Sequence, residues 1–227
     1  QSQRLAKLPH QIRLDINTES ARSRLAAGIV ETDRALEALA ALPATPRIAR
    51  SLARCRTLWL ELRGELRGGD GARINGLADG LMIAAGKLPF DIESDLGTPA
   101  GRLVDLSIRQ NMLAQRMARL YMQAQLGDRS HGLRVDMQQA RVEFVMSLGE
   151  LAGSSVNTRA IVESVELARM QWLFFENALA RPGERGLARD VASTSERIMQ
   201  MMDAIARQYL ESGATAPLAS AAPSSRN

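Results

Sequence analysis

The sequence predicts an all-α protein made of two tandem four-helix up-down bundles that are related by an internal duplication. The first observation is composition, since 45% of the 227 residues are hydrophobic and only 4% are aromatic. Ala, Leu, Arg, Glu and Met dominate the chain, which favours helices over strands. The second observation is a set of helix start signals followed by apolar residues at helical spacing. The third is a motif that occurs twice. Together they indicate two copies of a unit of about 110 residues, each large enough to bury a modest core.

The duplication is visible in two pairs of segments that match at nearly the same separation. Residues 2–8, Ser-Gln-Arg-Leu-Ala-Lys-Leu, recur 112 positions later as residues 114–120, Ala-Gln-Arg-Met-Ala-Arg-Leu. The two tryptophans, Trp59 and Trp172, lie 113 positions apart, and we expect both to fill cores. Further matches pair Ile48, Ser51, Arg56, Leu60 and Leu66 with Ile161, Ser164, Arg169, Leu173 and Leu179. Matches at one separation favour duplication over chance similarity.

The first unit, residues 1–88, is expected to hold four helices. Their predicted ranges are near 2–16, 19–42, 46–67 and 70–88. Pro9 should break or kink the first helix, because proline lacks a backbone N–H group. The dipeptide Thr45-Pro46 predicts the start of the third helix, since Thr caps helix N-termini and Pro suits the first helical position. Turn residues near 42–44 and 67–70 separate the helices.

The second unit, residues 98–212, is expected to follow a linker at 89–97. Its predicted helices lie near 99–127, 132–152, 158–181 and 187–212, and Thr98-Pro99 repeats the start signal. In the first of these helices an apolar seam at helical spacing is interrupted only by Gln110. Short connections force neighbouring helices to run antiparallel, which predicts the up-down arrangement. Residues 213–227 contain few large apolar groups and are expected to be a disordered tail.

Composition and spacing exclude several classes of function. The net charge is +4 and basic and acidic residues alternate, without a basic run or an aromatic platform, so we expect no nucleic-acid binding. His10 and His131 lie at expected helix breaks, and neither a Glu-x-x-His pair nor a nucleophile–histidine spacing occurs. We therefore expect no metal, no cofactor and no enzymatic activity. The single Cys55 is expected to be a buried filler. No stretch approaches eighteen apolar residues, so no membrane span is expected.

A long polar motif occupies the predicted helix near 99–127. Residues 101–121 read Gly-Arg-Leu-Val-Asp-Leu-Ser-Ile-Arg-Gln-Asn-Met-Leu-Ala-Gln-Arg-Met-Ala-Arg-Leu-Tyr. This segment resembles the signature of the PilJ-type domain, the N-terminal sensory domain of type IV pilus methyl-accepting chemotaxis transducers, which typically runs A-G-R-Q-R-M-L-S-Q-R-M-A-K. The positions kept are Arg109, Gln110, Met112, Leu113, Gln115, Arg116, Met117 and Ala118. The similarity extends to residues 171–179 and 193–199, and the first unit carries a degraded copy of the motif, so the resemblance covers residues 2 to about 211.

The resemblance implies a periplasmic sensory domain that binds a small ligand and performs no chemistry. The related periplasmic domains of nitrate and nitrite sensor kinases bind a planar oxyanion through arginine on the matching helix, where the guanidinium presents a fixed fork of donors. The resemblance thereby implies a binding site for a small, nitrate-like anion. This site would comprise Arg109, Gln110, Asn111, Gln115 and Arg116, facing Gln3 and Arg4 of the first copy. A membrane-bound signalling protein is the expected partner, and a homodimer is left open. Because the Ala/Pro/Ser-rich tail is typical of a terminus, we expect a free-standing protein.

Two departures from the family pattern keep a second hypothesis open. Ile108 stands where the family has a small residue, and Asn111 stands where it has its second arginine. Asparagine keeps a donor but loses the charge and the fork. In this second hypothesis the motif is structural: its arginines pair with carboxylates of neighbouring helices, and its amide side chains form a buried hydrogen-bond network that fixes helix register. The protein would then be a helical scaffold or partner-binding protein without a small-molecule ligand.

Overall fold

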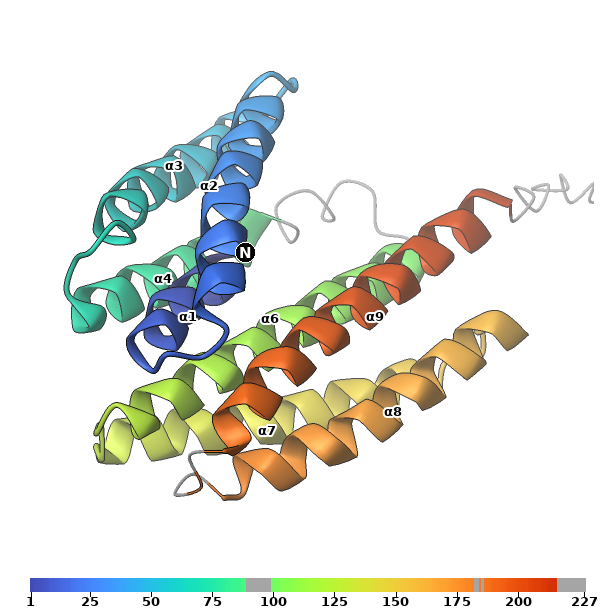
Figure 1. Cartoon of the computed structure of the whole chain (residues 1–227). Helices are drawn as coiled ribbons and strands as arrows, with labels where there is room; N and C mark the ends of the chain where they lie inside the picture. The colour runs from blue at the N-terminus through green and yellow to red at the C-terminus, as the bar shows by residue number, and fades with distance from the viewer. Residues whose placement is uncertain (89–98, 182–183, 185, 216–227) are drawn as a thin grey trace, which may run out of the picture.

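The structure is a computed structural model that describes residues 1–88, 99–181, 184 and 186–215. Within these residues the chain is helical and forms no strand, so the predicted all-α class is confirmed (Figure 1). The helices are α1 (Ser2–Arg13), α2 (Thr18–Ala40), α3 (Pro46–Glu65), α4 (Gly71–Ala85), α6 (Pro99–Gln125), α7 (His131–Ala152), α8 (Arg159–Leu179) and α9 (Leu187–Thr215).

Side-chain caps begin four of these helices. Thr45 accepts a hydrogen bond from the backbone N–H of Ile48, and Pro46 occupies the first helical position, as the sequence predicts. Asp70, Ser130 and Thr158 cap α4, α7 and α8 in the same way, each accepting from the backbone N–H three residues later. Each cap satisfies a donor that the helix cannot pair internally, which stabilises the helix by about 1 kcal/mol.

Helices α1 to α4 form a first group, here called unit 1. Each helix packs on the next, and α4 packs back on α1, so the four close into a ring. Leu5, Leu62 and Ile74 surround Trp59 in its core, and none of these four residues is more than 2% exposed. The Trp59 indole donates from Nε1 to Asp33 Oδ1 at 2.7 Å, which satisfies the polar atom of a buried ring.

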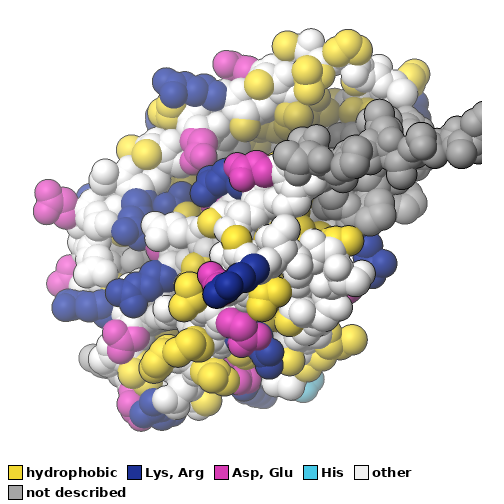
Figure 2. Space-filling view, turned by 90° about the vertical axis from the view of Figure 1, so that its right-hand side faces the viewer, with side chains coloured by type: hydrophobic (Ala, Val, Ile, Leu, Met, Phe, Trp, Pro, Cys, Tyr) yellow, Lys and Arg dark blue, Asp and Glu magenta, His cyan; other side chains and the backbone are white. Residues whose placement is uncertain are grey.

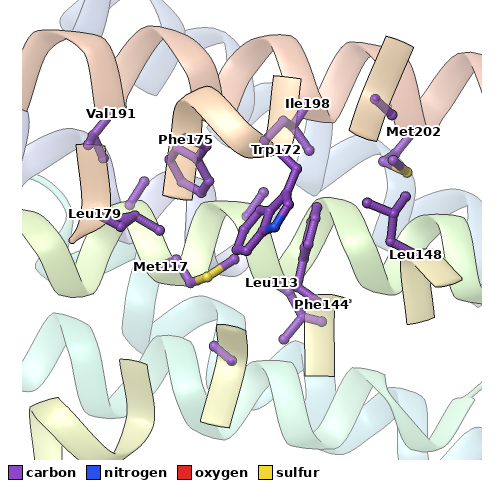
Figure 3. Close-up of a cluster of buried hydrophobic side chains, with 14 of the residues drawn as sticks. Leu113, Met117, Phe144, Leu148, Trp172, Phe175, Leu179, Val191, Ile198 and Met202 are labelled. Atoms are coloured by element: carbon purple, nitrogen blue, oxygen red, sulfur yellow. The ribbon is translucent and has the colours of Figure 1, made fainter. Parts of the chain in front are cut away.

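Helices α6 to α9 form a second group, here called unit 2, which closes into a ring in the same order. Trp172 lies at the centre of its core, with Met117, Phe144 and Ile198 around it (Figure 3). The rings of Trp172 and Phe144 stack with centroids 4.3 Å apart, a contact that contributes about 0.5–1.5 kcal/mol beyond area burial. Both tryptophans therefore fill cores, as expected.

The two units meet along α1 and α6. Figure 1 shows α1 lying against α6, with α2 to α4 on one side and α7 to α9 on the other. Ile16, in the turn between α1 and α2, is buried among the core residues of unit 2. Thr98 and the expected linker at 89–97 lie outside the described residues. The origin of the units by duplication stays a prediction.

Four local expectations are wrong. Pro9 does not break α1, which runs through it, because its flanking residues Leu8 and His10 are buried on both sides of the proline and hold the helix in place; whether Pro9 kinks the helix stays a prediction. His10 is thus inside a helix rather than at a break. The same helix ends at Arg13 instead of residue 16, since Asp15 and Asn17 adopt left-handed backbone angles. At the other end, α9 continues to Thr215, three residues into the segment expected to be disordered; residues 216–227 lie outside the described part.

The surface carries charges of both signs. Figure 2 shows basic and acidic side chains intermixed with apolar ones on the face it presents, without a single basic stripe. Among the described helices, none has both the length and the apolar character needed to cross a membrane.

Candidate functional site

The two copies of the repeated motif face each other where α1 meets α6. Four of their polar side chains are almost entirely removed from water: Gln3 and Gln115 are 1% exposed, Arg119 is 1% exposed and Lys7 is 0% exposed. Gln3 and Lys7 on α1 occupy the same motif positions as Gln115 and Arg119 on α6. Burying two cations and two amides is costly unless each finds partners, so their contacts decide what the motif does.

Lys7 projects from α1 into unit 2. Its Nζ donates to Gln115 Oε1 at 2.7 Å, to Ser195 Oγ at 2.9 Å and to Glu196 Oε1 at 2.8 Å. All three donors of the ammonium group are therefore used. Burial lowers the pKa of Lys7 from 10.5 to about 8, against the opposing attraction of Glu196.

Arg119 makes the corresponding contacts in the opposite direction, from α6 into unit 1. Its Nε donates to Gln3 Oε1 at 2.9 Å, and its Nη2 donates to both carboxylate oxygens of Asp79 at 2.8 and 3.0 Å. Burial lowers the pKa of Arg119, and Asp79 opposes that shift. Each unit thus inserts a cation that binds the motif glutamine and one carboxylate of the other unit.

The two glutamines complete this reciprocal arrangement. Gln115 donates from Nε2 to the backbone carbonyl of Ser195 at 2.9 Å, and Gln3 donates from Nε2 to the carbonyl of Ala78 at 3.1 Å. Each amide therefore accepts from the cation of the opposite unit and donates to a carbonyl within its own unit. We call the six side chains of this network the clamp: Gln3, Lys7, Asp79, Gln115, Arg119 and Glu196.

Glu196 is the most heavily shared member of the clamp. Besides Lys7, it receives hydrogen bonds from Arg4, whose Nη2 lies 2.8 Å from Oε2, and an ion pair from Arg24 Nη1 at 3.3 Å. Burial alone would raise its pKa, but the charge of Lys7 and the hydrogen bonds from Arg4 and Lys7 lower it from 4.5 to about 2. Glu196 is therefore ionised at neutral pH with three cations around it.

Arg116 occupies the motif position that corresponds to Arg4. Its Nη2 lies 3.3 Å from Asp136 Oδ2, and its Nε lies 3.8 Å from Asp79 Oδ1. Its side chain is 14% exposed, as is that of Arg4. The Nε atom is buried without a hydrogen-bond partner among the described residues. Both arginines predicted to hold a ligand across the interface are thus paired with carboxylates of the protein.

The remaining residues of the predicted anion site pair with residues outside the clamp. Arg109 pairs with Glu143 on α7 and its side chain is 57% exposed. Gln110 is buried and donates to the backbone carbonyl of Phe144 at 2.8 Å, and Asn111 donates to Asp203 Oδ1 at 2.9 Å. These three side chains pair with α7 and α9 and make no hydrogen bond or ion pair with Gln3 or Arg4.

A cavity of about 580 Å³ lies beside the N-terminal half of the motif. Ile108, Met112 and Arg109 line it together with Leu36 and Leu81 of unit 1. Its walls are mainly aliphatic, and Arg109 is already engaged by Glu143. Its chemistry therefore suits an apolar group better than the nitrate-like anion predicted here.

A second polar pair lies deeper in unit 1. His10 is 2% exposed, and its Nε2 lies 2.9 Å from Asn75 Oδ1, while Nδ1 has no partner among the described residues. Burial lowers the pKa of His10, so the ring is neutral at pH 7. Within the described residues, no group of three or more His, Cys, Asp or Glu side chains could hold a metal ion.

Sequence reasoning missed four members of the clamp: Lys7, Asp79, Arg119 and Glu196. The repeat could have revealed the cations, because Lys7 and Arg119 correspond at the same 112-residue separation as the motif glutamines. The carboxylates could not be found in this way, since Asp79 and Glu196 lie on the last helix of each unit and are 117 positions apart.

Comparison with protein-family models, with curated proteins and with solved structures finds no match to this chain. The resemblance to the PilJ-type domain accordingly stays a prediction.

Proposed function

We propose that this chain is a non-enzymatic helical scaffold, in which the repeated motif clamps two four-helix units into one arrangement. The observation that supports this most directly is reciprocity: Lys7 binds Gln115 and Glu196, while Arg119 binds Gln3 and Asp79. A ligand site needs donors that are free to meet the ligand. Here the cations of both motif copies are engaged by side chains of the opposite unit or of the same interface.

The competing hypothesis places a small anion on the motif, facing Gln3 and Arg4. An anion there would have to displace Glu196 from Arg4, or Asp79 and Asp136 from Arg116. Glu196 would lose the charge-assisted hydrogen bonds from Arg4, of about 1.5–3 kcal/mol each, and Asp79 and Asp136 would lose their ion pairs with Arg116. The internal pairs therefore favour the scaffold role over ligand binding at this position. The periplasmic location and the signalling partner rest on the family resemblance and remain part of the proposal.

Thermal unfolding of Arg4→Ala and Arg116→Ala separates the two hypotheses. If the motif is structural, both substitutions lower the melting temperature, because each leaves a carboxylate with fewer partners. The matched control is Arg159→Ala, which removes a surface ion pair with Glu163 from a side chain that is 94% exposed; exposed pairs contribute about 0–1 kcal/mol.

The same proteins are then heated with nitrate, nitrite and other small anions. The scaffold role predicts that no anion-dependent stabilisation is lost on replacing Arg116. An Arg116→Ala protein that melts like the native protein, but no longer responds to an anion that stabilises the native protein, would reject the scaffold role and support the motif as a ligand site.

A further inference from the structure

A separate polar cavity lies on the unit 2 side of the corner between α1 and α2. Its volume is about 240 Å³, and it is lined by Gln11, Asn17, Ser20 and Arg24 from that corner and by Ser193, Glu196, Arg197 and Gln200 from α9. None of the residues predicted as a ligand site lines it. The cavity is therefore a feature of the contact between units that the motif did not reveal.

Positive charge exceeds negative charge around this cavity. The only carboxylate in its lining is Glu196, which already forms ion pairs with Arg4, Lys7 and Arg24. Arg197, on the opposite wall from Arg24, makes no ion pair with any residue that the structure describes. Within the lining, the two cations Arg24 and Arg197 thus accompany one carboxylate, and Arg4 and Lys7 pair with that carboxylate from outside the lining. A surplus of this kind attracts anions.

Gln11 supplies a neutral hydrogen-bonding group to the cavity. It is 4% exposed and lines the cavity, yet its side-chain amide makes no hydrogen bond within the described residues. The amide atoms of Gln11 are not among the fully buried atoms that lack a partner, so they are accessible from the cavity and can pair with water or with a ligand there. Its amide nitrogen offers two donors to such a partner.

The first turn of α2 adds to the positive potential. Asn17 stands at the N-cap of this 23-residue helix but makes no side-chain hydrogen bond to its N–H groups. Asn17 and Ser20, both from this end of the helix, line the cavity. The N-terminus of a helix carries a partial positive charge and unpaired N–H groups, which favour an anion nearby.

We propose that this cavity binds a small oxyanion, with Arg24 and Arg197 as its charged ligands from facing helices and Gln11 as a neutral donor. Guanidinium forks match the oxygens of carboxylate, phosphate and sulfate groups. The volume is below the roughly 300–1,000 Å³ of sites for drug-sized ligands, so the ligand is small. This site goes beyond the scaffold role, since an anion here joins α2 to α9 without displacing any member of the clamp.

Isothermal titration of the full chain tests the site with phosphate, sulfate, nitrate and malonate as probes, at constant ionic strength set with chloride. The native protein is compared with the double variant Arg24→Gln/Arg197→Gln and with Gln11→Leu. The matched control is Arg22→Gln/Arg207→Gln, which removes the same charge from exposed positions on the same two helices, outside the cavity lining. Arg197→Gln alone serves if the double variant does not fold, because Arg197 is exposed and its loss leaves no carboxylate unpaired.

At least one oxyanion is expected to bind the native and control proteins alike. The affinity should fall about tenfold or more in the site variants, the loss that one charge-assisted hydrogen bond represents. Binding of phosphate or sulfate would identify an inorganic type of ligand, and binding of malonate a carboxylate; either supports the site. The proposal is overturned if no probe binds the native protein, or if site and control variants lose affinity equally. Neither result bears on the clamp, which is tested by unfolding without any ligand.

Discussion

Replacing Lys7 by methionine tests the central contact of the clamp. Lys7→Met keeps the length and the apolar stem of the side chain, which is 0% exposed, and removes only the ammonium group. Three hydrogen bonds disappear, to Gln115, Ser195 and Glu196. The substitution leaves no cavity of consequence, so any loss of stability reports on the polar contacts rather than on packing.

Two opposing terms set the size of the effect. Burial lowers the pKa of Lys7 from 10.5 to about 8, so removing the ammonium group relieves a cost of burying a charge, and the net losses measured for broken buried pairs already include that relief. Removing the cation, however, leaves Glu196 buried with one partner fewer, and breaking a buried pair on one side costs about 3–5 kcal/mol. Because Arg4 and Arg24 still hold Glu196, we expect the lower end, about 3 kcal/mol.

A double-mutant cycle measured by urea unfolding at pH 7 makes the reasoning refutable. Lys7→Met and Glu196→Gln should each destabilise the protein, whereas the double variant should lose at least about 1 kcal/mol less than the sum, since neither charge is then stranded. The mirror substitution Arg119→Met should cost less than Lys7→Met, because its carboxylate partner Asp79 is 31% exposed and can be solvated. A Lys7→Met protein within about 0.5 kcal/mol of the native one would refute the clamp.

Three further outcomes follow from the same structure. The pKa of Glu196 is lowered from 4.5 to about 2, so the stabilisation of the fold by its ionised form is complete above pH 4.5 and is lost as the pH falls towards 2. Between these pH values the unfolding free energy of the native protein should drop by about 3 kcal/mol more than that of Glu196→Gln. Equal pH dependence of the two proteins in this range would contradict the prediction. Cys55 is 1% exposed and burial raises its pKa, so a thiol reagent should modify it only on unfolding, and rapid reaction of the folded protein would show otherwise. An added Cβ at Gly28 would lie 2.7 Å from buried Leu5 Cδ2, whereas Gly76 on α4 has open space. Gly76→Ala should therefore raise the stability by about 0.5–1 kcal/mol. In thermal unfolding, Gly28→Ala should be less stable than Gly76→Ala by about 1 kcal/mol or more. Equal stabilities of the two variants would argue against the close contact of α1 with α2.

The helices were predictable because the signals that start them are local. Thr45 with Pro46 marks the first turn of α3 in the sequence and in the structure. The position of the tryptophans in the cores was also predictable, since large apolar side chains on a helical stripe must be buried. The continuity of α1 through Pro9 was not predictable, because burial of the neighbouring residues outweighs the local cost of a proline inside a helix, and burial depends on tertiary packing.

The candidate site was predictable only in part, for a related reason. The repeat drew attention to Gln3, Arg4, Gln115 and Arg116, and all four lie at or beside the α1–α6 contact. Whether these side chains are free or engaged depends on carboxylates that approach from other helices. Asp79 and Glu196 arrive from α4 and α9, and nothing local to the motif specifies them.

In both halves of the interface a cation binds the motif glutamine and one carboxylate of the other unit, but the two halves differ in net charge. This difference connects the clamp with the proposed anion site. On the Asp79 side, Arg116 and Arg119 face Asp79 and Asp136, so two cations meet two carboxylates. On the Glu196 side, Arg4, Lys7 and Arg24 face a single carboxylate. Arg24 and Asp136 are 112 positions apart, the separation of the motif copies, so one repeat position carries opposite charges in the two units. The balanced half needs nothing further to compensate its charge. The half with surplus positive charge is the one that opens onto the polar cavity, where an oxyanion would compensate it.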